Sequence, residues 1–362
     1  MIYLDHAATE PLSQAAKDAI MEHIDDFGNP SSVHELGRKS RLIIEDARER
    51  IAKCINAEPE NIYFTSGGSE ANTMALFDRY SCTSNIEHHS IMGADNIFLV
   101  DNDGLIHPKD VFLTLGDEYE DSYNMASCMF VNNEIGTIQP IKAIARTTHT
   151  LRTYFHTDAV QAVGHIPVDV KDLDCDRLSA SGHKFGALKG TGFLYSKIRF
   201  YRKPLIHGGK QENGLRPGTE NVLGIVSMAA ALEDAVEHME ERNTHIKHLR
   251  DILLDRLLQI EGSHLNGSLE NRVASNINIR FDGVPGSRLV TLCSLYGVYI
   301  SAGSACNEGT PQPSHVLKAI GLSDEEALSS VRITLGYENT LKEIDTASDI
   351  IAALVRRIRN DV

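Results

Sequence analysis

Two segments near the start of the chain carry apolar side chains at helical spacing. Residues 11–26 and 34–55 both repeat them every three or four positions, which predicts two amphipathic helices. Between them lies FGNPSS (27–32), whose Gly, Asn and Pro are typical of a turn and whose serines are candidate N-caps. The pattern therefore predicts a pair of helices joined by a tight connection.

From residue 61 to residue 196 the pattern changes to short apolar runs. Most are bounded by Gly, Ser, Asn or Asp, as buried strands are, and they read NIYFTS, NIFLV, ASCMFVN, TYFHTDA, DRLSAS and GTGFLYS. Helical patterns over 69–79 and 140–152 fall between some of these runs. This alternation predicts an α/β fold built on a mostly parallel sheet flanked by helices.

The last third of the chain predicts a second, smaller unit. Residues 219–260 read as helical throughout, SNINIRF, VYISAG and VRITLG read as strands, and 341–359 reads as a closing amphipathic helix. A chain of 362 residues exceeds one typical core. We therefore predict a large domain over 13–250 and a small α+β domain formed by 1–12 and 251–362.

Composition and charge exclude several classes of protein. The chain is 42% hydrophobic and 23% charged, and no stretch approaches the roughly 20 apolar residues that a membrane span needs. The first residues, MIYLDHAATEPLS, lack the charged and apolar regions of a signal peptide, so we expect a cytoplasmic protein without a membrane partner. A formal charge of −15 argues against a nucleic-acid partner, because phosphate contacts require basic patches.

The cysteines predict neither a metal site nor a disulfide framework. All six stand far apart, without CxxC pairs or zinc-type spacing: Cys54, Cys82, Cys128, Cys175, Cys293 and Cys306. Five are expected to be small buried hydrophobes. Cys306 differs, because SAGSACNEG is turn-like and polar and lacks the periodic pattern of a core strand. Its thiol is therefore a candidate for chemistry.

Reactive side chains follow several of the predicted strands. In an open α/β sheet such groups gather at the carboxyl ends of strands. Lys184 in SASGHKFG follows an apolar strand, so desolvation should lower the pKa of its amine and favour imine formation. Asp158 ends the strand of HTDAVQ. A lysine imine with a carboxylate partner is what pyridoxal phosphate (PLP) requires, because the carboxylate keeps the ring nitrogen protonated.

A phosphate group needs donors, and TSGGSEAN supplies them. Gly67 and Gly68 allow close approach of the backbone, and Ser69 opens a predicted helix whose free N–H groups favour an anion. Each feature alone is commonplace: an isolated lysine is usually a surface residue, and SGGS occurs in many turns. All three together, in this order, indicate a PLP enzyme.

At this level of detail the chain resembles the cysteine desulfurases of the Nif/Isc-like group, class V aminotransferases of PLP fold type I. The resemblance extends from YLDHAAT (3–9) to VRITLG (331–336). Its motifs occur in family order: FGNPSS, FTSGGSEAN, IEHHS, VNNEIG, HTDAVQ, SGHKFG, HGG, RPGT and SAGSAC.

The resemblance implies roles for individual residues. Lys184 corresponds to the Schiff-base lysine, Asp158 to the partner of the pyridine nitrogen, and Gln161 to a residue bonding the ring hydroxyl. His88 corresponds to the histidine that stacks on the ring and assists proton transfer. The phosphate cradle would be formed by Gly68, Ser69, Ser181 and His183, and by Thr219 from the neighbouring subunit of a homodimer.

The resemblance also implies the substrate and the sulfur acceptor. Asn133 would contact cofactor and substrate, and Arg332 would pair with the substrate carboxylate through its planar fork. Cys306 corresponds to the cysteine that takes the sulfur of L-cysteine as a persulfide, leaving L-alanine, for delivery to an acceptor protein such as an iron–sulfur scaffold. Desulfination of cysteine sulfinate, selenocysteine cleavage, transamination and a non-catalytic scaffold remain alternatives.

Overall fold

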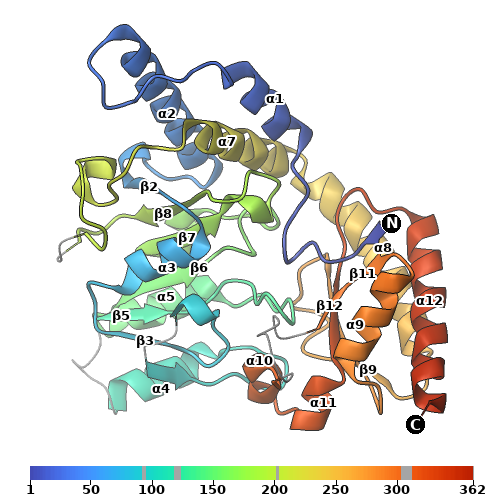
Figure 1. Ribbon diagram of the computed structural model, residues 1–362. Coiled ribbons are helices and arrows are strands. Elements are labelled where there is room, and N and C mark those ends of the chain that lie inside the picture. Colours follow the sequence, from blue (N-terminus) through green and yellow to red (C-terminus); the bar gives the residue numbers. More distant parts are fainter. Residues whose placement is uncertain (92–94, 118–123, 201–203, 303–311, 362) are drawn as a thin grey trace.

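A seven-stranded sheet forms the centre of the larger part of the molecule (Figure 1). The computed structural model describes residues 1–91, 95–117, 124–200, 204–302 and 312–361. The strands lie in the order β2 (Ile62–Thr65), β8 (Gly192–Ser196), β7 (Arg177–Ser181), β6 (Tyr154–Asp158), β5 (Met125–Ser127), β3 (Ser81–Ser84) and β4 (Asp95–Phe98). β8 runs antiparallel to both of its neighbours, β2 and β7, and the other paired strands of this sheet are parallel. The predicted α/β fold with a mostly parallel sheet is confirmed.

Helices surround this sheet, and the first two pack against the long α7 (Figure 1). Their bounds are α1 (Gln14–His23), α2 (Glu35–Cys54), α3 (Gly68–Leu76), α4 (Pro108–Asp117), α5 (Ile141–Thr150), α6 (Val170–Leu173) and α7 (Val222–Glu237). The expected serine caps of FGNPSS are not used for α2. His34 caps that helix instead, its Nδ1 accepting from the amide of Gly37 at 3.3 Å.

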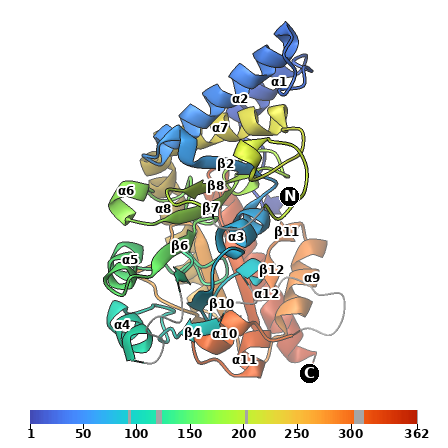
Figure 2. The same ribbon diagram turned by 90° about the vertical axis from the view of Figure 1, so that its left-hand side faces the viewer.

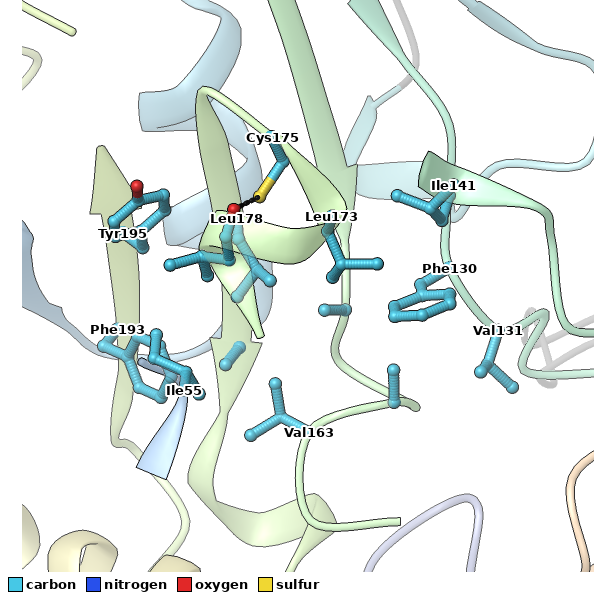
Figure 3. Packing of buried hydrophobic residues seen from close by; sticks show 14 of the residues in the cluster. Ile55, Phe130, Val131, Ile141, Val163, Leu173, Cys175, Leu178, Phe193 and Tyr195 are labelled. Atoms are coloured by element: carbon cyan, nitrogen blue, oxygen red, sulfur yellow. Dashed lines mark hydrogen bonds between the residues drawn. The ribbon is translucent and has the colours of Figure 1, made fainter. Parts of the chain in front are cut away.

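The core beneath the sheet explains why its strands read as apolar runs. Phe193 and Tyr195 of β8 and Leu178 of β7 are buried in one cluster with Phe130 and Ile141 (Figure 3). Strands covered on both faces need apolar side chains at successive positions. Cysteines fill small gaps in the interior, and burial is complete for Cys82, Cys128, Cys175 and Cys293.

The C-terminal part of the chain forms a second sheet with its own helices, beside the seven-stranded sheet (Figure 2). Its antiparallel sheet has the order β12 (Ser301–Ala302), β13 (Ser330–Thr334), β10 (Asn276–Phe281) and β9 (Ser263–Leu265). Its helices are α8 (Met239–Leu258), α9 (Gly286–Leu295), α10 (His315–Ala319), α11 (Asp324–Leu328) and α12 (Leu341–Asn360).

The first residues of the chain return to this C-terminal part. Strand β1 (Ile2–Tyr3) pairs in parallel with β11 (Val298–Tyr299). Ile2 and Leu4 share a buried cluster with residues from Ile246 to Ile358. The domain limits expected at 12/13 and 250/251 stay a prediction.

Several local expectations were wrong in detail. The helix expected over 219–260 is interrupted at His238, which separates α7 from α8. The run VYISAG forms two short strands, β11 and β12, that pair with different partners. Short 3₁₀ turns lie next to strands at Pro59–Asn61, His89–Ile91 and Gly182–Lys184, and another precedes α7 at Glu212–Gly214. Within the described residues, no helix combines the length and apolar character needed to cross a membrane.

Candidate active site

A cavity of about 360 Å³ lies where the large sheet meets the C-terminal part. Its walls come from the N-terminal segment, the strand ends of the sheet, the start of α3, and strands β12 and β13. Ten of the residues predicted from the sequence line it: Gly68, Ser69, His88, Asn133, Asp158, Gln161, Ser181, His183, Lys184 and Arg332. Segments that are distant in the sequence therefore line the same cavity.

Asp158 is the most buried acidic group of the cavity, with 4% of its surface exposed. It is the last residue of strand β6, so its side chain lies at the carboxyl end of that strand. The amide of Val160 donates to Oδ1 at 2.9 Å, and Nδ2 of Asn72 donates to Oδ2 at 2.6 Å. Burial raises the pKa of Asp158, while these two hydrogen bonds act in the opposite direction. A cationic group placed beside this carboxylate would stabilise its charged form.

Lys184 ends the turn that follows β7, and its amine is held by backbone carbonyls. Nζ donates to the oxygens of Ala7 and Ala8 at 2.7 and 2.9 Å. Burial lowers the pKa of Lys184 to about 8, and the Arg332 cation acts in the same direction. An ordinary lysine has a pKa near 10.4, so this amine is far more often neutral, and therefore nucleophilic, near neutral pH.

The start of α3 has the features of an anion site. Gly67 has a φ of +156°, and no side chain caps the helix there. A Cβ on Gly68 would lie 2.6 Å from Cγ2 of Val160, so only glycine fits without displacement of that side chain. Uncapped N–H groups and the helix dipole favour a phosphate at such a position.

Two histidines of the cavity have pKa values below the ordinary range, which favours their neutral forms. Burial lowers the pKa of His88, and burial with the nearby Lys184 and Lys189 cations lowers that of His183 to about 4. The backbone amide of Ser90 donates to Nδ1 of His88 at 3.1 Å. Because Nδ1 accepts, the proton of neutral His88 lies on Nε2.

Arg332 of β13 also lines the cavity and is 8% exposed. Nη1 donates to the carbonyl of Asn133 at 2.8 Å, and Nη2 donates to Oδ1 of Asp5 at 2.9 Å. Its Nε is buried and has no hydrogen-bond partner in the described structure. The guanidinium lines the cavity, and its planar fork is the group that pairs best with a carboxylate.

Three predicted residues need separate comment. Gln161 lines the cavity and donates from Nε2 to the carbonyl of Ala7 at 2.9 Å. Thr219 lies elsewhere, in a smaller hollow with Glu212 and Arg216. Cys306 lies outside the described residues, although Ser301 and Ala302 line the cavity just before the segment that contains it.

Four polar residues that line the cavity were not among the predicted site residues: Asn72, His89, Glu134 and Ser301. Asn72 contacts Asp158, and its spacing from Ser69 places both on one face of α3, a signal that was available. Glu134 lies in VNNEIG beside the predicted Asn133 and is 5% exposed. Its burial could not be read from the sequence, because it depends on contacts with the distant C-terminal part.

The fold and this cavity define the chain as an α/β enzyme, and comparison gives its family. The family described as aminotransferase class-V matches residues 2–346, so the chain belongs to that family. The chain is 41% identical to the cysteine desulfurase IscS of Methanosarcina thermophila, over 99% of this chain and 93% of that protein.

Solved structures agree with this family membership. A NifS-like protein from Rickettsia africae has a TM-score of 0.90 at 30% identity, covering 99% of each chain. A structure described as SspA in complex with cysteine has a TM-score of 0.79 at 32% identity, covering 94% of this chain and 100% of that one.

Proposed function

We propose that the chain is a PLP-dependent cysteine desulfurase that converts L-cysteine to L-alanine and holds the sulfur on Cys306. One observation carries the proposal: Lys184, Asp158 and Arg332 line a single cavity in a chain whose relatives are named cysteine desulfurases. The amine, the acid and the guanidinium are the groups that bind a PLP ring and an amino-acid carboxylate.

The residues of the cavity fit PLP. The Asp158 carboxyl, buried and bonded only to neutral donors in the described structure, suits a protonated ring nitrogen. The uncapped start of α3, with Ser69, Ser181 and His183 nearby, suits the phosphate. Lys184 would hold the aldehyde carbon. When bound, PLP supplies an electron sink for charge that develops at the substrate α-carbon.

The protein groups divide the remaining work. Arg332 would hold the substrate carboxylate, because its guanidinium lines the cavity and its planar fork matches a carboxylate. Lys184, with a pKa of about 8, can both accept and return a proton near neutral pH. His88 would donate from Nε2, since its Nδ1 already accepts from Ser90.

Cys306 would supply the nucleophile for the sulfur. Its thiolate attacks the sulfur of L-cysteine, so that the new sulfur–sulfur bond forms as the carbon–sulfur bond breaks. The bonding electron pair stays with the carbon skeleton, which takes up protons and leaves as L-alanine. The persulfide on Cys306 then passes to an acceptor protein, such as an iron–sulfur scaffold.

A homodimer and a cytoplasmic location are further parts of the proposal. Thr219 belongs to the predicted phosphate cradle but lies outside the cavity of its own chain. A second subunit would bring its Thr219 to this cavity, as the family resemblance implies.

The test is a product assay on protein reconstituted with PLP. We expect L-alanine in amounts equal to sulfide when L-cysteine and a thiol reductant are supplied. Lys184→Ala should abolish both products, and Lys189→Ala, which removes an exposed lysine nearby, should leave them unchanged. Preferred turnover of cysteine sulfinate or selenocysteine over L-cysteine would identify one of the alternative lyases instead.

A further inference from the structure

The first residues of the chain run beside β13, the strand that carries Arg332. The amide of Thr334 donates to the carbonyl of Leu4 at 2.8 Å, and the amide of Ala7 donates to Oγ1 of Thr334 at 2.9 Å. Asp5 forms a parallel bridge with Thr334. The N-terminus lies among the C-terminal elements as a result (Figure 1). This pairing brings Asp5 next to Arg332, although the two residues are 327 positions apart in the sequence.

Two acceptors hold the guanidinium of Arg332. Nη2 donates to Oδ1 of Asp5 at 2.9 Å, and Nη1 donates to the carbonyl of Asn133 at 2.8 Å. These bonds use two of the five N–H donors of the group, one on each terminal nitrogen, and so fix the plane in which it lies. An arginine side chain has several rotatable bonds, and ordering it without such contacts is entropically unfavourable.

The backbone of Asp5 is itself held by a closed turn. The amide of Ala8 donates to the carbonyl of Asp5 at 2.9 Å. The hydroxyl of Tyr3 lies 3.0 Å from the carbonyl oxygen of Asp5 and 2.9 Å from that of Thr9, so its proton can bond either end of the turn. The same turn accepts the amine of Lys184. Asp5 therefore belongs to a fixed part of the cavity surroundings.

The charge of Asp5 makes its position informative. Arg332 is among the described residues that line the cavity, and Asp5 is not. A carboxylate beside a carboxylate-binding group repels the substrate carboxylate and weakens the positive potential of the arginine. Asp5 is therefore a disadvantage for substrate binding unless the orientation that it gives to Arg332 matters more.

We propose that Asp5 is a positioning residue for recognition of the substrate carboxylate, acting through Arg332. This inference rests on the proposed function. Its content is that Asp5 orients the fork of Arg332 and so determines the preference for an amino acid over an amine without a carboxylate. The competing explanation is that Asp5 only compensates the charge of a largely buried arginine.

Two ligands that differ only in the carboxylate separate these explanations. L-alanine has the carboxylate and ethylamine lacks it, and neither carries sulfur. Their dissociation constants follow from the change in the visible cofactor band of protein reconstituted with PLP. We expect Asp5→Ala to weaken L-alanine binding about tenfold or more, because the hydrogen bond to a charged group is lost and Arg332 turns away. Ethylamine binding should not change.

A conservative variant and steady-state kinetics give two further readouts. Asp5→Asn keeps an oxygen acceptor at the same position, so its loss of L-alanine affinity should be smaller, about threefold or less. The KM for L-cysteine should rise in parallel with the dissociation constant of L-alanine, while kcat changes little, as expected for loss of an interaction made equally in the ground and transition states.

Asp234 provides the matched control. Its Oδ2 accepts from Nη2 of Arg242 at 2.8 Å, so the two atoms have the same chemistry and nearly the same separation as in the pair of Asp5 and Arg332. Both residues line a different cavity, of about 280 Å³. Asp234→Ala should leave both dissociation constants and the KM at their wild-type values.

The outcomes distinguish this inference from the proposed function. If the wild type binds L-alanine but forms no sulfide from L-cysteine, the proposed function fails, and the two dissociation constants alone decide the role of Asp5. Unchanged or tighter L-alanine binding in Asp5→Ala would overturn the inference. An equal loss for ethylamine, or an equal loss in Asp234→Ala, would also overturn it, because the effect would then be a general one on the structure.

Discussion

Nδ2 of Asn72 donates a 2.6 Å hydrogen bond to Oδ2 of Asp158, and both side chains are buried. Asn72 also donates to Oγ of Ser90 at 2.9 Å, which in turn bonds His88. The side-chain amide of Asn72 thus orients Asp158 directly and His88 through Ser90. The groups that donate hydrogen bonds to Asp158 in the described structure are neutral amides. A cationic ligand can therefore pair with the negative charge of this carboxylate.

The first prediction concerns this charge. Asp158→Asn should lower kcat/KM for L-cysteine by about 100-fold or more, because a preorganised charge beside the reacting ring is lost. The free energy of unfolding of the cofactor-free protein should change by less than about 1 kcal/mol, since release of a buried charge offsets one lost hydrogen bond. Steady-state kinetics and urea unfolding measure the two effects.

Asp176 provides the matched control. It is also a buried acid beside β7, but it bonds His149 at 2.7 Å and the amide of Phe155 at 2.7 Å. Asp176→Asn should cost about 1–3 kcal/mol of stability and leave cofactor binding intact. Equal losses of activity in Asp158→Asn and Asp176→Asn would contradict a special role for Asp158.

The second prediction concerns the pH dependence of Lys184. Only the neutral amine reacts with an acylating reagent, so labelling of Lys184 in cofactor-free protein should rise with pH through a midpoint near the pKa of about 8. The reactive form is lost as pH falls below this value. Mass spectrometry of the labelled peptide reports the curve, and a midpoint close to the ordinary 10.4 would show that the amine is solvated.

The third prediction concerns recognition of the substrate carboxylate. Arg332 lines the cavity, and Arg332→Lys keeps its positive charge but loses the fork geometry. We expect KM for L-cysteine to rise about 10- to 100-fold, the equivalent of roughly 1.5–3 kcal/mol for hydrogen bonds to a charged group. Arg280→Lys on the neighbouring β10, where Arg280 pairs with Glu326, is the control and should leave KM unchanged. An unchanged KM in Arg332→Lys would place the carboxylate elsewhere.

Much of the fold could be predicted because its central strands are buried on both faces. β6, β7 and β8 stood out as apolar runs, whereas β3, with the sequence SCTS, did not, although all four of its residues are buried. Small polar side chains resemble a loop until their neighbours are known. β1 and β11 are two residues long and pair across almost the whole chain, which no local pattern can reveal.

Some residues of the candidate site could likewise be predicted from the sequence, and others could not. Asp158 and Lys184 were predictable because the ends of adjacent strands converge on one edge of a sheet. Glu134 was not, because its burial depends on contacts with the distant C-terminal part, such as that with Ser314, whereas the spacing of Asn72 from Ser69 was a usable signal. Thr219 and Cys306 stay predictions: one lies outside the cavity of its own chain, the other outside the described residues.

The most direct measurement of the whole account is mass spectrometry of the peptide that contains Cys306. Protein reconstituted with PLP is incubated with L-cysteine without reductant, alkylated and digested. We predict a gain of one sulfur atom on this peptide, accompanied by L-alanine, and neither product in Lys184→Ala. An unmodified Cys306 peptide in a sample that releases L-alanine would contradict the account.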